Sequence, residues 1–127
     1  MVDLDDLGSD FGKATGVNNH GQVVGWVITD SLHAFSWTQE GGMIDLGPQT
    51  EALAVNDSGE VVGSGGPDNT AFSWTQHGGM VWLGTIGGIN DEPVAINNRG
   101  QAVGVSDVVD SFGFFHAHAV LWETRGH

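Results

Sequence analysis

The fold is decided by the stretch VNNHGQVVG, Val17–Gly25, which recurs as VNDSGEVVG at residues 55–63 and as INNRGQAVG at residues 96–104. In the shared Asn-x-x-Gly pattern, the Asn side chain caps a type I turn and the Gly supplies the positive φ that closes a β-hairpin. The sequence therefore predicts three hairpin tips. Their paired residues are Asn18 with Gly21, Asn56 with Gly59, and Asn97 with Gly100.

Two further landmarks recur in the same order. AFSW at residues 34–37 returns at 71–74 and, more loosely, as AVLW at 119–122. GGMIDLG at residues 41–47 returns as GGMVWLG at 78–84. Because alternate residues of a strand share a face, the Phe and Trp of the first motif project from one side and its small residues from the other. Three ordered landmarks indicate three copies of one unit of roughly forty residues.

Each unit is expected to hold about four strands. In the first unit we place them at 14–17, 22–27, 34–38 and 43–46, where β-branched and aromatic residues cluster in short runs. The 21 glycines mark many tight turns, and no stretch sustains a helical period free of Gly. The expected class is all-β. Four short strands in roughly forty residues fit a β-propeller blade and also a β-trefoil lobe.

We expect one domain over residues 1–127, with units at about 6–44, 45–81 and 82–127. The third unit lacks its Gly-Gly-Met strand, whereas Asp6-Leu7-Gly8 matches Asp45-Leu46-Gly47. Residues 1–8 are therefore expected to complete the last unit, as the exchanged strand does that closes a ring of blades. This shifted register suggests a complete set of three units.

The combination of NxxGQVVG, His33-Ala34-Phe35-Ser36-Trp37 and GGMIDLG resembles the HAF-repeat family of bacterial extracellular proteins over nearly the whole chain. The resemblance implies an all-β tandem array in secreted or surface proteins, with no established activity and no catalytic residues to transfer. The chain departs from the family pattern at Thr70, which replaces the His, and in its third copy. We also expect no export signal in the sequence as given, because acidic residues follow Met1 where a signal peptide has basic ones.

Propellers ordinarily carry four to eight blades, so three units are too few to close a ring. Two chains with two-fold symmetry would supply six, and we therefore expect a homodimeric six-bladed propeller. The alternative is a β-trefoil monomer, in which three lobes close on themselves.

The net charge of the chain limits the kinds of partner that it can bind. The sequence contains three Lys and Arg residues and 16 Asp and Glu residues, which gives a formal charge of −13. Nucleic acid and anionic membranes are therefore not expected as partners. Such a charge keeps a protein soluble and suits saline surroundings that screen its self-repulsion. The absence of Cys excludes disulfides and thiolate chemistry.

Candidate metal ligands lie at two places. His116 and His118 flank Ala117, so on a strand both rings project from one face and are the weak candidates for a bound metal. The alternative is that they are ordinary surface histidines, with His118 the repeat equivalent of His33. Calcium could be held by the acidic cluster Asp3, Asp5, Asp6 and Asp10, although no EF-hand loop is present. The other interpretation is a solvated acidic terminus. We therefore predict no cofactor.

Ligand-binding candidates lie where the copies differ. Trp37, Trp74 and Trp122 recur at equivalent positions and are expected in the core, whereas Trp26 and Trp82 are not repeated and are candidates for stacking on a sugar. The turn tips also vary, which adds His20 and Arg99 as weak candidates.

Two classes of function remain open. The first is a non-enzymatic binding or assembly module whose loops bind a glycan, a protein or a small polar molecule. The second is a hydrolase with its site at the mouth of the ring. The sequence has no nucleophile elbow, phosphate loop or metal triad, so we assign no catalytic residue and expect no enzyme.

Overall fold

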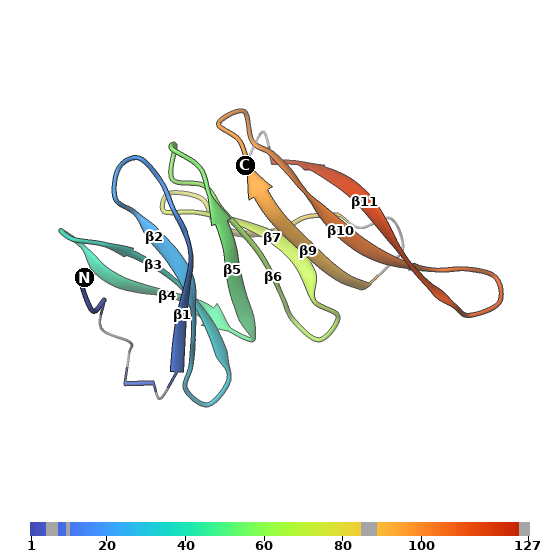
Figure 1. Ribbon diagram of the computed structural model, residues 1–127, viewed down its shortest axis with the longest axis horizontal. Helices are drawn as coiled ribbons and strands as arrows, with labels where there is room; N and C mark the ends of the chain where they lie inside the picture. Colours follow the sequence, from blue (N-terminus) through green and yellow to red (C-terminus); the bar gives the residue numbers. More distant parts are fainter. Residues whose placement is uncertain (5–7, 10, 85–88, 125–127) are drawn as a thin grey trace.

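The structure, a computed structural model, describes residues 1–4, 8–9, 11–84 and 89–124. These residues form eleven strands in three antiparallel sheets and no helix, which confirms the all-β class (Figure 1). Within them, no helix is therefore long and apolar enough to cross a membrane.

Each sheet is built from consecutive strands. The first has the order β1-β2-β3-β4, with strands at Phe11–Val17, Val23–Ile28, Leu32–Thr38 and Gly42–Pro48. The second has the order β5-β6-β7-β8, at Thr50–Val55, Val61–Gly65, Thr70–Thr75 and Gly79–Trp82. The third has the order β11-β10-β9, with β9 at Ile89–Ile96, β10 at Gln101–Val109 and β11 at Phe115–Glu123. The four strands expected in the first unit are confirmed.

The three predicted hairpin tips are also confirmed. In each, the Gly donates its N–H to the carbonyl oxygen of the Asn three residues earlier at 3.2 Å, and the φ angles of Gly21, Gly59 and Gly100 are 80°, 88° and 78°. The Asn side-chain oxygen accepts hydrogen bonds from backbone N–H groups within the same turn, as at Asn18 Oδ1, which His20 and Gln22 approach at 2.9 and 3.0 Å. All three tips lie side by side along one edge of the molecule (Figure 1).

The sheets differ from the expected units at their boundaries. The expected limit between residues 44 and 45 falls inside β4, because Met43 and Ile44 pair with Trp37 and Ser36 of β3 and so belong to the first sheet. Among the described residues the third sheet has three strands. The segment expected to complete it includes Asp6 and Leu7, which lie outside the described residues, while residues 2–4 lie beside the first sheet.

The sheets stand in an open row and are joined by their first strands. β5 packs on β1, β2 and β3 of the first sheet, and β9 packs on β5, β6 and β7 of the second. The first junction is a core of six buried residues: Val24, Ala34, Leu46, Ala52, Val61 and Phe72. The second is formed by Val62, Ala71, Ala102 and Trp122. Trp122 is thus in the core as expected, and Trp37 and Trp74 are partly buried.

The row closes neither into a barrel nor into a ring within the described residues, and its first and third sheets lie at opposite ends (Figure 1). A β-trefoil needs one barrel shared by all three lobes, whereas these strands form three separate sheets. The trefoil alternative therefore does not agree with the structure.

Candidate functional site

One face of the third sheet is exposed, although the equivalent faces of the first and second sheets are buried. Val24, Val62 and Val103 occupy the same position in the three units, and their exposed fractions are 0%, 0% and 46%. Val24 lies in the core between the first and second sheets, and Val62 in the core between the second and third. Among the described residues, no sheet follows the third one to cover Val103. The difference between equivalent residues thus comes from what covers them.

The neighbours of Val103 extend this apolar surface, which we call the open face of the third sheet. Val103 pairs with Leu121 and Val105 pairs with Ala119, so alternation along the strands places all four side chains on one side. Leu121 is 54% exposed, and Ala119 is exposed although its equivalents Ala34 and Ala71 are fully buried. Exposed apolar patches are enriched at interaction surfaces, which makes the open face a candidate for one.

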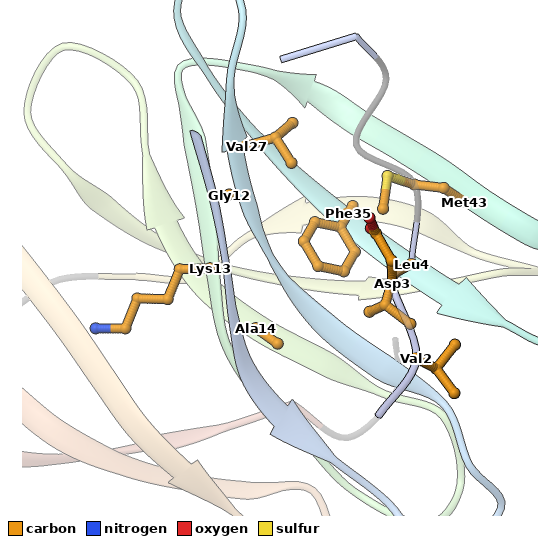
Figure 2. A pocket seen from close by; sticks show the side chains of 9 residues that line it. All are labelled: Val2, Asp3, Leu4, Gly12, Lys13, Ala14, Val27, Phe35 and Met43. Carbon is orange, nitrogen blue, oxygen red and sulfur yellow. The ribbon is translucent and has the colours of Figure 1, made fainter. Parts of the chain in front are cut away.

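The first sheet presents the opposite surface at the other end of the row. Ala14 is exposed, whereas its equivalents Ala52 and Pro93 are buried against the preceding sheet. Here a pocket of about 300 Å³ is lined by residues of all four strands and by residues 2–4. Figure 2 shows Phe35 and Met43 reaching into it beside the segment that carries Asp3 and Leu4. The N-terminal segment thus partly covers this face.

A ladder of hydrogen bonds joins neighbouring turn tips. Asn18 Nδ2 donates to the carbonyl oxygen of Asn56 at 3.0 Å, and Asn56 Nδ2 donates to that of Asn97 at 2.9 Å. Beside it, the N–H of Asn19 donates to Asp57 Oδ1 and the N–H of Asp57 to Asn98 Oδ1, both at 2.8 Å. The hydrogen bonds that the Asp57 carboxylate accepts, first of all from the backbone N–H of Asn19, hold its pKa below the ordinary value. The ladder thus repeats at both junctions between neighbouring units.

The variable tip residues His20 and Arg99 project at the ladder end of the molecule, where both are exposed. Between the tips, a polar groove of about 280 Å³ is lined by the Asn and Asp residues of the ladder and by Val17, Val55 and Ile96. The side-chain amides of Asn18 and Asn56 are already engaged in the turns and the ladder. The structure thus brings the predicted tip residues to the same edge of the molecule. The ladder side chains there are already hydrogen-bonded within the protein.

The predicted metal ligands His116 and His118 do not form part of a larger set of ligands among the described residues. His116 Nε2 lies 2.7 Å from Asp110 Oδ2, and the described residues hold no group of three or more His, Cys, Asp or Glu able to bind a metal. The hydrogen bond with His116 lowers the pKa of Asp110, whose Oδ1 also accepts the N–H groups of Phe112 and Phe114. His118 is exposed. Of the acidic cluster, Asp5, Asp6 and Asp10 lie outside the described residues, and Asp3 lines the pocket of Figure 2.

The two unrepeated tryptophans differ. Trp26 is partly buried and stacks on Phe11, with ring centroids 5.5 Å apart and an interplanar angle of 22°. Trp82 is 50% exposed and lines a cavity of about 320 Å³ with the loop that follows β6. Of the two, Trp82 is thus the one whose ring is open to solvent beside a cavity.

Sequence reasoning missed a charged set on the first strands of the sheets. Lys13, Glu51 and Glu92 occupy equivalent positions, and aligning the repeats would have found them. Burial and the nearby charge of Glu92 raise the pKa of the Glu51 carboxyl, and Lys13 opposes this. Glu51 and Glu92 line a small acidic cavity of about 190 Å³ between the second and third sheets.

The chain matches no family model, and comparison with curated proteins and with solved structures found no match. The resemblance to the HAF-repeat family therefore stays a prediction.

Proposed function

We propose that this protein is a non-enzymatic assembly module that completes a six-bladed β-propeller by packing end to end against a second copy of itself. The observation that carries the proposal is the exposure of Val103 where Val24 and Val62 are fully buried. Two junctions inside the chain use this surface in the same way. The third copy of this surface, the open face of the third sheet, would be covered by the first sheet of another chain, because that sheet carries the complementary face.

The open ends of the ladder support the same contact. Asn97 Nδ2 donates within its own turn to Gln101 Oε1 at 2.9 Å and has no following Asn carbonyl among the described residues. In a second copy the carbonyl oxygen of Asn18 would stand in that place. The ladder has a direction, donor to acceptor from first to third unit, so it specifies a head-to-tail contact. Such a contact closes when the rotation per unit completes a circle.

Two copies of three sheets give six, within the four to eight blades that propellers use. Each chain would then bury its third-sheet face and its first-sheet face, once each. Residues 2–4 lie on the first-sheet face in the single chain (Figure 2), so the incoming sheet must displace them. Released from this face, the N-terminal segment could supply the missing outer strand of the partner's third unit.

The test is the molar mass in solution, measured by size-exclusion chromatography with light scattering over a range of concentrations and at low and high salt. We expect a species of twice the 13.3 kDa chain mass that gains population in high salt, because each chain carries a net charge of −13. A monomer under every condition would contradict the proposal.

A matched pair of variants locates the contact. Val103→Glu places a charge on a surface that is exposed in the single chain and buried in the assembly, so it should weaken association at least tenfold, equivalent to about 1.4 kcal/mol, without lowering the thermal stability of the monomer. Val81→Glu, at a similarly exposed position on β8, should leave association unchanged. Equal effects of the two would argue against this interface.

A hydrolase is the second candidate, favoured by the raised pKa of Glu51 beside Glu92. A glycosidase uses one carboxyl with a raised pKa and a second that is ionised. Chromogenic glycosides supply the assay, and turnover abolished by Glu51→Gln but kept in Glu40→Gln, at an exposed position on another turn, would establish it. No turnover on the substrates tested leaves the assembly module as the better-supported function.

A further inference from the structure

The second sheet departs from the first at one pair of equivalent positions. In the first sheet, His33 on β3 lies with Nδ1 3.0 Å from Asp45 Oδ1 on β4. In the repeat alignment, Thr70 stands in place of His33 and Trp82 in place of Asp45. The second sheet therefore carries a hydroxyl and an indole where the first carries an ion pair.

The indole of Trp82 is exposed and held in place. Of the five tryptophans, all within the described residues, it is the only one whose side chain is largely open to solvent, at 50%. The ring of Phe72, itself fully buried, packs against it edge to face with centroids 6.0 Å apart. On another side, Cη2 of the six-membered ring lies 3.8 Å from the position that a Cβ on Gly66 would occupy. Such a fixed aromatic surface is a rigid platform that loses little entropy when a ligand binds.

Beside the platform is a cavity of the size of a small ligand. It measures about 320 Å³ and is lined by Trp82, Thr70 and the loop residues Gly65, Gly66, Pro67 and Asp68. The loop is tied to β9, because Asn90 donates its N–H to the Asp68 carbonyl oxygen at 2.9 Å and Asp91 donates to that of Asn69 at 2.8 Å. The Asp68 carboxylate makes no hydrogen bond to any described residue. An aromatic floor with a few fixed polar groups is the usual composition of a small-ligand site.

We propose that this cavity binds one ring of a neutral saccharide. The C–H face of a pyranose carries partial positive charge and packs on the electron-rich face of an indole. Its hydroxyl groups would donate to the Asp68 carboxylate and exchange hydrogen bonds with the Thr70 hydroxyl. Both polar groups stand on the rim of the same cavity as Trp82.

Charge and geometry select this ligand class. Asp68 and the net charge of −13 repel anionic sugars. A quaternary ammonium ion would be held by a cage of several aromatic faces. Here Phe72 is fully buried, and among the described residues that line the cavity Trp82 supplies the only aromatic face.

The site does not depend on the proposed assembly. The second sheet has its neighbours on both sides within one chain, so Trp82 is equally exposed in a monomer and in a ring of two chains. In the ring, each assembly would present two such sites and bind a multivalent glycan with added avidity.

The test is binding of the full chain to an array of neutral oligosaccharides of glucose, galactose, mannose and N-acetylglucosamine, followed by calorimetry on the best one. We expect binding that falls at least tenfold in Trp82→Ala and severalfold in Asp68→Asn. Trp82→Phe should retain part of it, because a smaller aromatic face remains. Phe112→Ala, which removes a more exposed ring from another part of the surface, should bind as the parent does.

The double variant Thr70→His with Trp82→Asp guards against misfolding, because it installs the pair that the first sheet already uses. It should keep the parent's thermal stability and lose saccharide binding. Binding that survives this double variant, absence of binding to every sugar on the array, or binding of choline in place of a sugar would each overturn the proposal. None of these results depends on the oligomeric state.

Discussion

At the scale of single residues, three equivalent glycines set how closely neighbouring strands approach. Gly25, Gly63 and Gly104 lie on the second strand of each sheet. A Cβ at each would collide with a carbonyl oxygen of the first strand, that of Lys13, Glu51 or Glu92 respectively. The sequence repeat shows that Gly recurs at this position. The reason for it, a collision between a Cβ and the carbonyl oxygen of the paired strand, is seen only in the structure.

Gly63→Ala tests this requirement. The new methyl group would meet backbone atoms of Glu51 and Ala52 as well as the Phe72 ring, so we expect a loss of about 3 kcal/mol or more in the free energy of unfolding. Gly84→Ala is the control, because nothing lies within 4 Å of its Cβ position and its stability should stay within about 0.5 kcal/mol of the parent. Urea denaturation measures both. Equal stability of the two variants would contradict the close approach.

His33 makes the stability of the first sheet depend on pH. Hydrogen bonds to Asp45 and Asp30 raise the pKa of His33 above 6.5, despite the opposing effect of partial burial. The stabilisation is therefore fully present below pH 6.5, while both carboxylates remain ionised, and is lost as the pH rises through the raised pKa. We expect the parent to melt at a higher temperature at pH 6 than at pH 8.

His33→Gln should reduce this difference between pH 6 and pH 8, and an NMR titration of the His33 ring would give the pKa directly. Thr70 in the second unit has no such partner, so it makes no matching contribution. A value at or below 6.5 for His33 would show that the two carboxylates do not act on it as described.

At the scale of elements, the sequence predicts the hairpins well because their information is local. Asn18, Gly21 and the alternation that follows them determine a turn and a strand within nine residues, and the structure confirms the hairpin. The third unit was harder. The matching triplet Asp6-Leu7-Gly8 predicted a strand on the third sheet, and this stays a prediction because Asp6 and Leu7 lie outside the described residues. Of the preceding residues, Val2, Asp3 and Leu4 lie against the first sheet, where Phe35 and Met43 offer an apolar surface. A local match carries no information on which distant surface a segment will cover.

The ladder between the tips is an element that pattern reading does not reveal. The capping Asn was predicted, but its second role as a donor to the next unit depends on how far apart the sheets stand. The same limit applies to Glu51 and Glu92, whose proximity arises from the packing of β9 on the second sheet.

Asn56→Ala and Asn97→Ala separate the two roles of the ladder residue. Asn56 is buried and both caps its turn and donates to the third unit, so its loss should cost about 2 kcal/mol. Asn97 is exposed and only caps its turn in the single chain, so its loss should cost about 1 kcal/mol. Chemical denaturation at low protein concentration measures both. An equal cost would show that the bond between units contributes nothing.

At the scale of the whole molecule, charge is the property that the sequence predicts most directly. A net charge of −13 on 127 residues repels itself in any compact state. Sodium chloride at about 1 M reduces the screening length to about 3 Å, so we expect the melting temperature to rise between low and high salt. Differential scanning calorimetry of the Val103→Glu variant, at a concentration where light scattering gives the mass of one chain, separates this effect from assembly. A melting temperature that stays constant or falls would contradict it.

The two ends of the row are not equivalent, since residues 2–4 shield the first sheet and the described residues leave the third sheet bare. In polymer terms, the proposed ring would form by two identical condensations, each joining the bare end of one chain to the protected end of the other. Closure would therefore be governed by the removal of a protecting group rather than by the strength of the bare face. A chain whose protecting segment cannot leave would still offer its bare end, so it would pair once and leave the ring open, and a tighter N-terminal segment would thus block ring closure.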